Sequence, residues 1–233
     1  MRPIYLFADS QLLFWKMGEV PFLASIRDPR LAHAPRAAYI GASNGDAPEY
    51  YAIFQAALEG IGVVTCWMIH SAFSSPDQTF LREADIVLLA GGDVERGWRV
   101  LGQTGMKELI VERYQAGATL IGVSAGAVQL GSHGIREREG SPDELFETLN
   151  LCPFVVIAHG EERAWSDAGH AARLLDRTTR AVGIPSGGGL VYHADRRLDA
   201  VRRPAHEFLF ERGEVTRRVL IPIAPDVTPL GRS

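Results

Sequence analysis

The chain has 233 residues, of which 46% are hydrophobic and 22% are charged. These values are ordinary for a globular protein, and the length suits one large α/β domain over residues 1–233 better than two independent domains. Because the formal net charge is only −4, the composition argues against a nucleic-acid or anionic-membrane partner.

The sequence also gives indications of its compartment. No apolar run approaches the roughly 18–20 residues that a helix needs to span a bilayer. The N-terminal apolar stretch meets Asp9 at once, so we expect a first strand there and not a signal peptide. Cys66 and Cys152 lie in apolar surroundings and are too few for a disulfide framework. We therefore expect reduced cysteines and a cytoplasmic protein.

Strand-like and helix-like segments alternate along the whole chain, which predicts a mostly parallel sheet covered by helices on both faces. Asp46 is the expected N-cap of the first helix, with Pro48 in its first turn. The last two strands are expected to form a hairpin. The predicted strands cover residues 4–8, 37–40, 63–68, 84–90, 119–123, 154–158, 181–184, 207–210 and 215–223. The predicted helices cover residues 48–58, 106–116 and 168–177, and another begins near residue 95.

Three of the predicted strands end in residues that can carry chemistry. Gly91 and Gly92 follow the strand at 84–90, Ser124 follows the strand at 119–123, and His159 follows the strand at 154–158. In open α/β sheets, ligands bind outside the carboxyl ends of the strands. We therefore expect these residues to lie together at one site.

Ser124 lies in the run Gly-Val-Ser-Ala-Gly at residues 122–126, between a predicted strand and a predicted helix. This G-x-S-x-G pattern is typical of a sharp turn that exposes a nucleophilic serine. The helix that follows offers unpaired N–H groups where an oxyanion would develop. The alternative is a tight turn whose serine only caps the helix.

A serine hydroxyl needs a base with a pKa near 7, and His159 meets that need. The backbone N–H groups of Gly92 and Ala125 are the expected oxyanion hole. The alternatives are a structural histidine and an ordinary glycine turn. The seven histidines show no HExxH spacing and the cysteines no CxxC spacing, so we expect no metal site.

The group that would orient the imidazole is open at this stage. Glu139 and its neighbour Glu137 lie in a polar segment predicted as a loop, and Glu161 and Glu162 follow the histidine closely. Ser186 lies in a glycine-rich loop and could hold the imidazole N–H through its hydroxyl. Each of these carboxylates could equally be a solvated surface charge.

These motifs together resemble the peptidase E and cyanophycinase family of serine peptidases. The resemblance spans most of the chain and implies a class I glutamine-amidotransferase-like fold, a three-layer α/β sandwich with a mostly parallel central sheet. It also implies a Ser-His dyad or triad, no metal, no organic cofactor, and hydrolysis of Asp-X dipeptides or of β-Asp-Arg links. The segments that carry it are residues 89–93, the elbow at 122–127, residues 153–159 and residues 183–185.

The chain departs from the family pattern at three places. Asp93 stands where the family usually has Asn, and Ser186 stands where it usually has the glutamate often taken as the triad acid. After the histidine the family carries several arginines, whereas this chain has Arg163 and Arg173 with Asp167 among the residues between them. We expect Asp93, Arg163 and Trp165 to contact substrate, without a preference for N-terminal aspartate.

The sequence therefore predicts a serine peptidase acting on a small peptide, as a monomer or homodimer. Three other functions are open. The chain could be an inactive ligand-binding or regulatory homologue, or an amidase or acyl-transfer enzyme of a biosynthetic pathway. It could also be an α/β-hydrolase esterase, which would need a late histidine such as His193 or His206.

Overall fold

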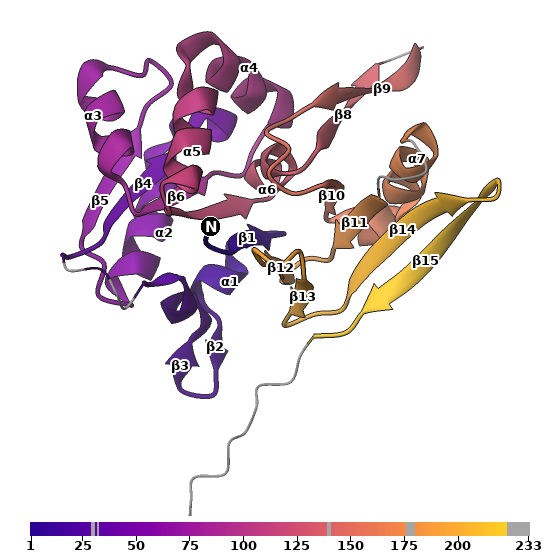
Figure 1. Ribbon diagram of the computed structural model, residues 1–233, viewed down its shortest axis with the longest axis horizontal. Coiled ribbons are helices and arrows are strands. Elements are labelled where there is room, and N and C mark those ends of the chain that lie inside the picture. Colours follow the sequence, from indigo (N-terminus) through magenta and orange to yellow (C-terminus); the bar gives the residue numbers. More distant parts are fainter. Residues whose placement is uncertain (29–30, 32, 139–140, 176–179, 223–233) are drawn as a thin grey trace, which may run out of the picture.

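The computed structural model describes residues 1–28, 31, 33–138, 141–175 and 180–222. Its larger sheet is mixed and has seven strands (Figure 1). Five neighbouring strands of this sheet, β1, β7, β6, β4 and β5, pair in parallel in that order, whereas β12 runs antiparallel to both β1 and β13. From one edge to the other, the strands are β13 (Leu198–Val201), β12 (Gly189–Tyr192), β1 (Ile4–Phe7), β7 (Thr119–Val123), β6 (Ile86–Leu89), β4 (Arg36–Ile40) and β5 (Thr65–Ile69).

Side chains alternate between the two faces of this sheet and fill two separate buried clusters. In β1, Ile4 and Leu6 belong to one cluster, and Tyr5 and Phe7 belong to the other. The Tyr5 face is covered by α1 (Gln11–Phe14), η1 (Phe22–Ile26) and α2 (Pro48–Glu59). The opposite face is covered by α3 (Ser75–Glu83), α4 (Val94–Thr104), α5 (Met106–Gln115) and α6 (Ala125–Leu130). The predicted α/β sandwich around a mostly parallel sheet is therefore confirmed.

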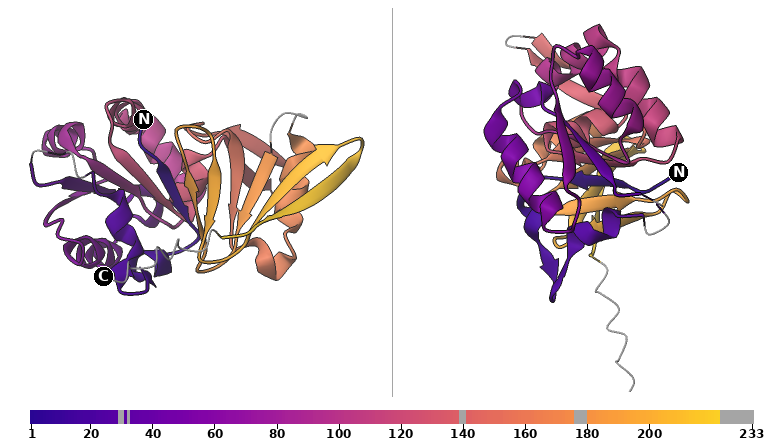
Figure 2. Two further views of the ribbon diagram at one scale, coloured as in Figure 1. Left: turned by 60° about the horizontal axis from the view of Figure 1, so that its bottom comes forward. Right: turned by 90° about the vertical axis from the view of Figure 1, so that its left-hand side faces the viewer.

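A second, four-stranded sheet adjoins the first (Figure 2). Phe154 and Val156 on one face of β10 join the main core, whereas Val155 and Ile157 pack against α7 (Ser166–Leu174). The strands of this sheet, in order, are β10 (Phe154–Ala158), β11 (Arg180–Ile184), β14 (Ala205–Glu211) and β15 (Glu214–Leu220). The strand that ends at His159 thus belongs to a different sheet from the strand that ends at Ser124.

Two local predictions are wrong. Asp46 does not cap α2, which follows Ala47; Asp46 has a φ of 62° and its carboxylate accepts a hydrogen bond from the Ser71 N–H at 2.8 Å. The segment predicted as a polar loop forms a hairpin of β8 (His133–Arg138) and β9 (Ser141–Glu147). Only its Ile135 and Leu145 pack on the α7 cluster, so the apolar alternation was too sparse to predict strands.

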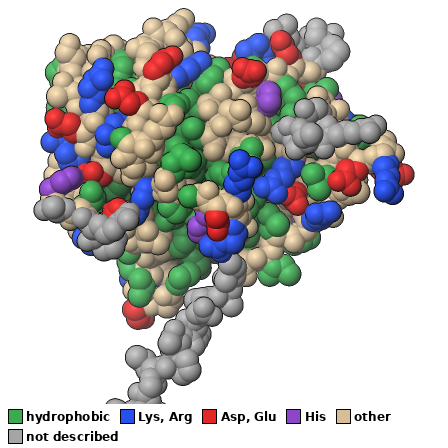
Figure 3. Space-filling model, viewed as in Figure 1, with side chains coloured by type: hydrophobic (Ala, Val, Ile, Leu, Met, Phe, Trp, Pro, Cys, Tyr) green, Lys and Arg blue, Asp and Glu red, His purple; other side chains and the backbone are tan. Residues whose placement is uncertain are grey.

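Four smaller elements complete the described residues: β2 (Lys16–Met17), β3 (Val20–Pro21), η2 (Ala42–Asn44) and η3 (Gly160–Arg163). The C-terminal hairpin of β14 and β15 is present as predicted. Basic and acidic side chains are scattered together over the face seen in Figure 3. None of the helices among the described residues has both the length and the apolar character needed to cross a membrane.

Candidate active site

Ser124 lies in a strained turn between β7 and α6. Its φ of 49° and ψ of −109° are unusual for a residue with a side chain. Its N–H donates to the Phe7 carbonyl at 2.8 Å, and its own carbonyl accepts from Ala127 and Val128. These bonds hold the turn that the G-x-S-x-G pattern predicted, with the serine at its tip.

Two glycines allow this turn to lie against its neighbours. A Cβ on Gly126 would lie 2.0 Å from the Leu89 carbonyl oxygen, and one on Gly122 would lie 2.6 Å from the Ala127 Cα. Both contacts are with backbone atoms, which have little freedom to move away. Because these two residues have no side chain, β6, β7 and α6 can pack closely enough to hold the backbone of Ser124 in its turn.

Gly126→Ala should therefore destabilise the protein by about 2 kcal/mol or more, because the added methyl overpacks a rigid contact. Gly169→Ala is the matched control, since Gly169 lies in α7 and a Cβ there meets nothing within 4 Å. That control should leave stability unchanged or raise it by about 0.5–1 kcal/mol. Urea unfolding of both variants measures the difference, and equal stabilities would contradict this account.

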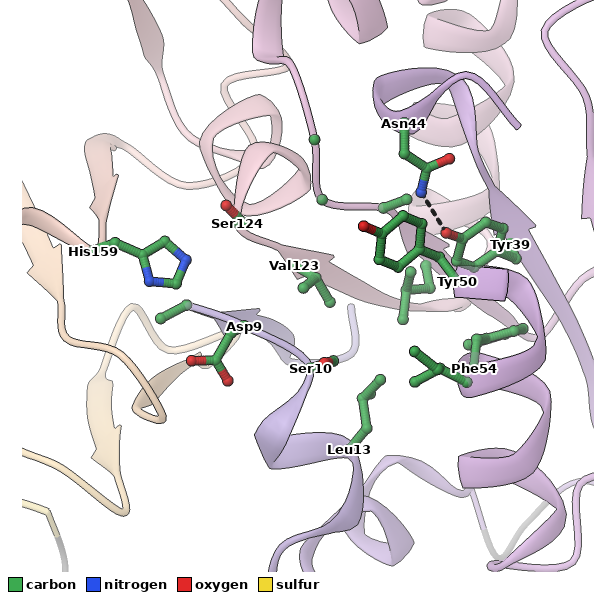
Figure 4. A pocket seen from close by; sticks show the side chains of 16 residues that line it. Asp9, Ser10, Leu13, Tyr39, Asn44, Tyr50, Phe54, Val123, Ser124 and His159 are labelled. Atoms are coloured by element: carbon green, nitrogen blue, oxygen red, sulfur yellow. Dashed lines mark hydrogen bonds between the residues drawn. The ribbon is translucent and has the colours of Figure 1, made fainter. Parts of the chain in front are cut away.

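A pocket of about 230 Å³ opens beside the turn and is lined by both Ser124 and His159 (Figure 4). Gly91 and Gly92 also line it, so three of the predicted strand ends do meet. Gly92 has a φ of 133°, and a Cβ there would lie 2.3 Å from the Ser43 carbonyl oxygen. Ala125, the other residue of the expected oxyanion hole, begins α6 and is buried.

His159 reaches the pocket from the second sheet. It follows β10 with a φ of 60°, and its N–H donates to the Ile184 carbonyl at 3.1 Å. Its Nδ1 lies 3.1 Å from the Ser186 Oγ. Among the described residues no hydrogen bond uses its Nε2, and none joins it to Ser124. Catalytic hydrogen bonds are often long or poorly aligned without substrate, so the lack of a bond between His159 and Ser124 is compatible with His159 as the base.

Ser186 links His159 to a carboxylate. The Ser186 N–H donates to Glu161 Oε1 at 2.7 Å, and Glu161 lies in η3 (Gly160–Arg163) just after the histidine. Burial acts to raise the pKa of Glu161, but hydrogen bonds from the Ser186 hydroxyl and backbone and the nearby His159 outweigh it, so this pKa lies below its usual value of 4.5. The carboxylate is therefore charged at neutral pH.

The lowered pKa of Glu161 predicts how the free energy of unfolding depends on pH. A carboxyl whose pKa falls on folding stabilises the native state above its unfolded pKa, and this contribution is lost as pH falls through the folded value. The stability difference between the wild type and Glu161→Gln should therefore be constant near neutral pH and shrink below about pH 4.5. Urea unfolding between pH 3 and 7 measures it; a difference that grows toward acid pH would contradict the assignment.

The other predicted site residues lie elsewhere. Asp93 caps α4, where its Oδ1 accepts from the Arg96 N–H at 2.7 Å. The Arg163 side chain is exposed and lies 3.4 Å from Asp167. Trp165 is only 4% exposed and packs beneath Gly160 and Gly183 in the α7 cluster, so it is part of a core. None of the three predicted substrate contacts lines the described pocket, and Glu139 lies outside the described residues.

The two late histidines also lie away from the pocket. His193 Nε2 is 2.8 Å from Asp199 Oδ2 on the β12–β13 hairpin. His206 packs on Trp165, and its pKa is lowered by burial and by Arg217. The described pocket contains neither histidine. The described residues also contain no group of three or more His, Cys, Asp or Glu that could hold a metal ion.

Sequence reasoning missed the half of the pocket that comes from the first 54 residues. Asp9 and Ser10 follow β1, and Asn44 follows β4, so all three lie at the carboxyl ends of parallel strands. The rule that located Ser124 could have located them too. Tyr50 and Phe54 come from α2 and gave no comparable signal.

The fold and the turn at Ser124 place the chain among α/β proteins that carry a serine on a strand–helix elbow. The model of peptidase family S51 matches residues 20–197, and the chain belongs to this family of serine-type peptidases. This confirms the resemblance found in the sequence.

Named relatives agree with this assignment, and a solved structure shares the fold. The protein named Peptidase E from Shewanella baltica is 30% identical over 169 residues, covering 66% of this chain and 68% of the relative. That from Streptomyces coelicolor is 28% identical over 152 residues, covering 60% of this chain and 61% of the relative's length. The crystal structure of a peptidase from an acI-B1 Actinobacterium shares the fold, with a TM-score of 0.69, 18% identity and 95% coverage of both chains.

Proposed function

We propose that this protein is a serine peptidase that cleaves a small peptide or isopeptide bond through an acyl-enzyme on Ser124, with His159 as the base. The observation that carries the proposal is that the strained Ser124 turn and His159 line one pocket. Membership of a serine peptidase family supports the same chemistry. Dipeptides are the substrates we favour, and we expect the protein to act in the cytoplasm as a monomer or homodimer.

The proposed reaction proceeds in two stages. Ser124 Oγ attacks the scissile carbonyl while His159 takes its proton, and the N–H groups of Gly92 and Ala125 stabilise the oxyanion. His159 then protonates the leaving amine as the C–N bond breaks. Water, deprotonated by His159, attacks the acyl-enzyme and releases the acid, which restores the Ser124 hydroxyl.

Ser124→Ala should abolish labelling by a fluorophosphonate probe and lower dipeptide turnover by several orders of magnitude, because the nucleophile is gone. His159→Ala should lower turnover on the same scale. Ser75→Ala, an exposed serine on α3, is the control and should be labelled and active like the wild type. Intact-mass measurement and a dipeptide assay provide the readouts. An unlabelled wild-type protein would instead indicate a non-catalytic binding homologue.

We further propose that Ser186 and Glu161 together orient the His159 imidazole, the function for which the resembled family usually has a glutamate at position 186. His159 Nδ1–H donates to Ser186 Oγ, and the Ser186 hydroxyl donates to the Glu161 carboxylate. This arrangement fixes the tautomer with Nε2 free toward Ser124 and places a negative charge one hydroxyl away from the imidazolium. The support is the 3.1 Å distance between His159 Nδ1 and Ser186 Oγ, together with the 2.7 Å bond from the Ser186 backbone N–H that holds the Glu161 carboxylate beside this hydroxyl.

Ser186→Ala should lower kcat by about 10- to 100-fold with little change in KM, and Ser186→Thr should retain most of the activity because the hydroxyl is kept. Glu161→Gln should also lower kcat, because the amide keeps the size of the side chain but removes the negative charge that stabilises the imidazolium. Steady-state kinetics measure both effects. An unchanged kcat in Glu161→Gln would exclude the carboxylate's role.

A further inference from the structure

We infer that the pocket beside Ser124 receives an apolar or aromatic side chain of the substrate residue next to the scissile bond, and that it disfavours an acidic one. The expected effect on catalysis rests on the proposed function. The expected effect on binding does not, because it follows from the residues and charges of the pocket wall and not from the nucleophile.

The wall of this pocket is mostly apolar. It opens into the buried cluster between α1, α2 and the ends of β6 and β7, and its volume of about 230 Å³ is below the roughly 300–1,000 Å³ of pockets for drug-sized ligands. It therefore suits a single side chain. The apolar residues that line it include Leu13, Ile53, Phe54, Leu88, Ala90 and Val123.

The charges of the pocket work against an anion. Among the described lining residues there is no Lys or Arg, and Asp9 is the one carboxylate. The Asp9 carboxylate accepts hydrogen bonds from the N–H groups of Gln11 at 2.8 Å and Gly187 at 2.6 Å, which hold it in place. An acidic side chain would lose its water, meet no cation and be repelled by Asp9.

The polar groups at the far end of the pocket are neutral. Tyr39 is 2% exposed and its hydroxyl accepts from the Asn44 amide at 2.7 Å, as the dashed line in Figure 4 shows. Burial raises the pKa of Tyr39 to about 12, so the phenol keeps its proton at working pH. This end can hydrogen-bond a polar tip but supplies no positive charge. Arg163, one of the predicted substrate contacts, is exposed and lies near Asp167.

The inference is tested with two dipeptide series, in which Phe, Leu, Ala and Asp occupy the first position before Ala or the second position after Ala. In the series whose variable residue enters the pocket, kcat/KM for Phe or Leu should exceed that for Ala or Asp by about 100-fold. Equal values in both series, or a preference for Asp in either, would overturn the inference.

A designed change of charge gives a second readout. Tyr50 lines the pocket and is 52% exposed, so Tyr50→Arg adds a cation at the rim with little risk to folding. This variant should raise the Asp-to-Phe ratio of kcat/KM at least 10-fold. Gln55→Arg, on the same helix but outside the described pocket wall, is the matched control and should leave the ratio unchanged. If Tyr50→Arg leaves the Asp-to-Phe ratio of kcat/KM unchanged, this pocket does not receive the substrate side chain.

Binding separates this inference from the proposed chemistry. Calorimetry of the Ser124→Ala protein with phenylalaninamide and aspartamide measures recognition without turnover. At least 10-fold tighter binding of phenylalaninamide supports the inference even if the wild type hydrolyses no dipeptide, in which case only the proposed function fails. Equal binding, or tighter binding of aspartamide, overturns the inference whether or not the enzyme is active.

Discussion

The site depends on one close backbone contact, the approach of α6 to β6 at Gly126 and Leu89. Because no side chain separates them, the turn after β7 can bend sharply enough to hold Ser124 in a conformation that residues with side chains rarely adopt. Buried apolar residues on both sheet faces supply the packing that keeps this strain from relaxing. The fold thereby presents one hydroxyl at the tip of a rigid turn.

The second sheet supplies the imidazole that the proposed mechanism needs beside Ser124. It delivers His159 to the pocket from β10, and the loop after β11 brings Ser186 Oγ within 3.1 Å of Nδ1 of the same imidazole. Since β10 and β11 are paired in parallel, both strands end at the same edge, and η3 brings Glu161 to the same place. A serine at the family's acid position thus has a carboxylate beside it that comes from another part of the chain.

The pocket combines these parts with an apolar surface from the N-terminal quarter of the chain. The strand ends contribute the reactive groups, whereas α1 and α2 contribute Leu13, Ile53 and Phe54. Under the proposed function, the strand ends therefore supply the chemistry, and α1 and α2 share in the selectivity with the apolar residues of β6 and β7. A change in α2 can alter which side chain is accepted while the turn at Ser124 is left intact, which is how one catalytic framework can serve different substrates.

The sequence by itself determined the alternation of strands and helices, the elbow at Ser124, and His159 as a strand-end residue, because each depends on residues that are neighbours in the chain. It also determined the serine at position 186. Only the tertiary structure decided that β10 leaves the central sheet, that Trp165 is core, and that Glu161 faces Ser186. Those outcomes depend on contacts between segments far apart in sequence or on the direction of a turn, and no local pattern encodes either.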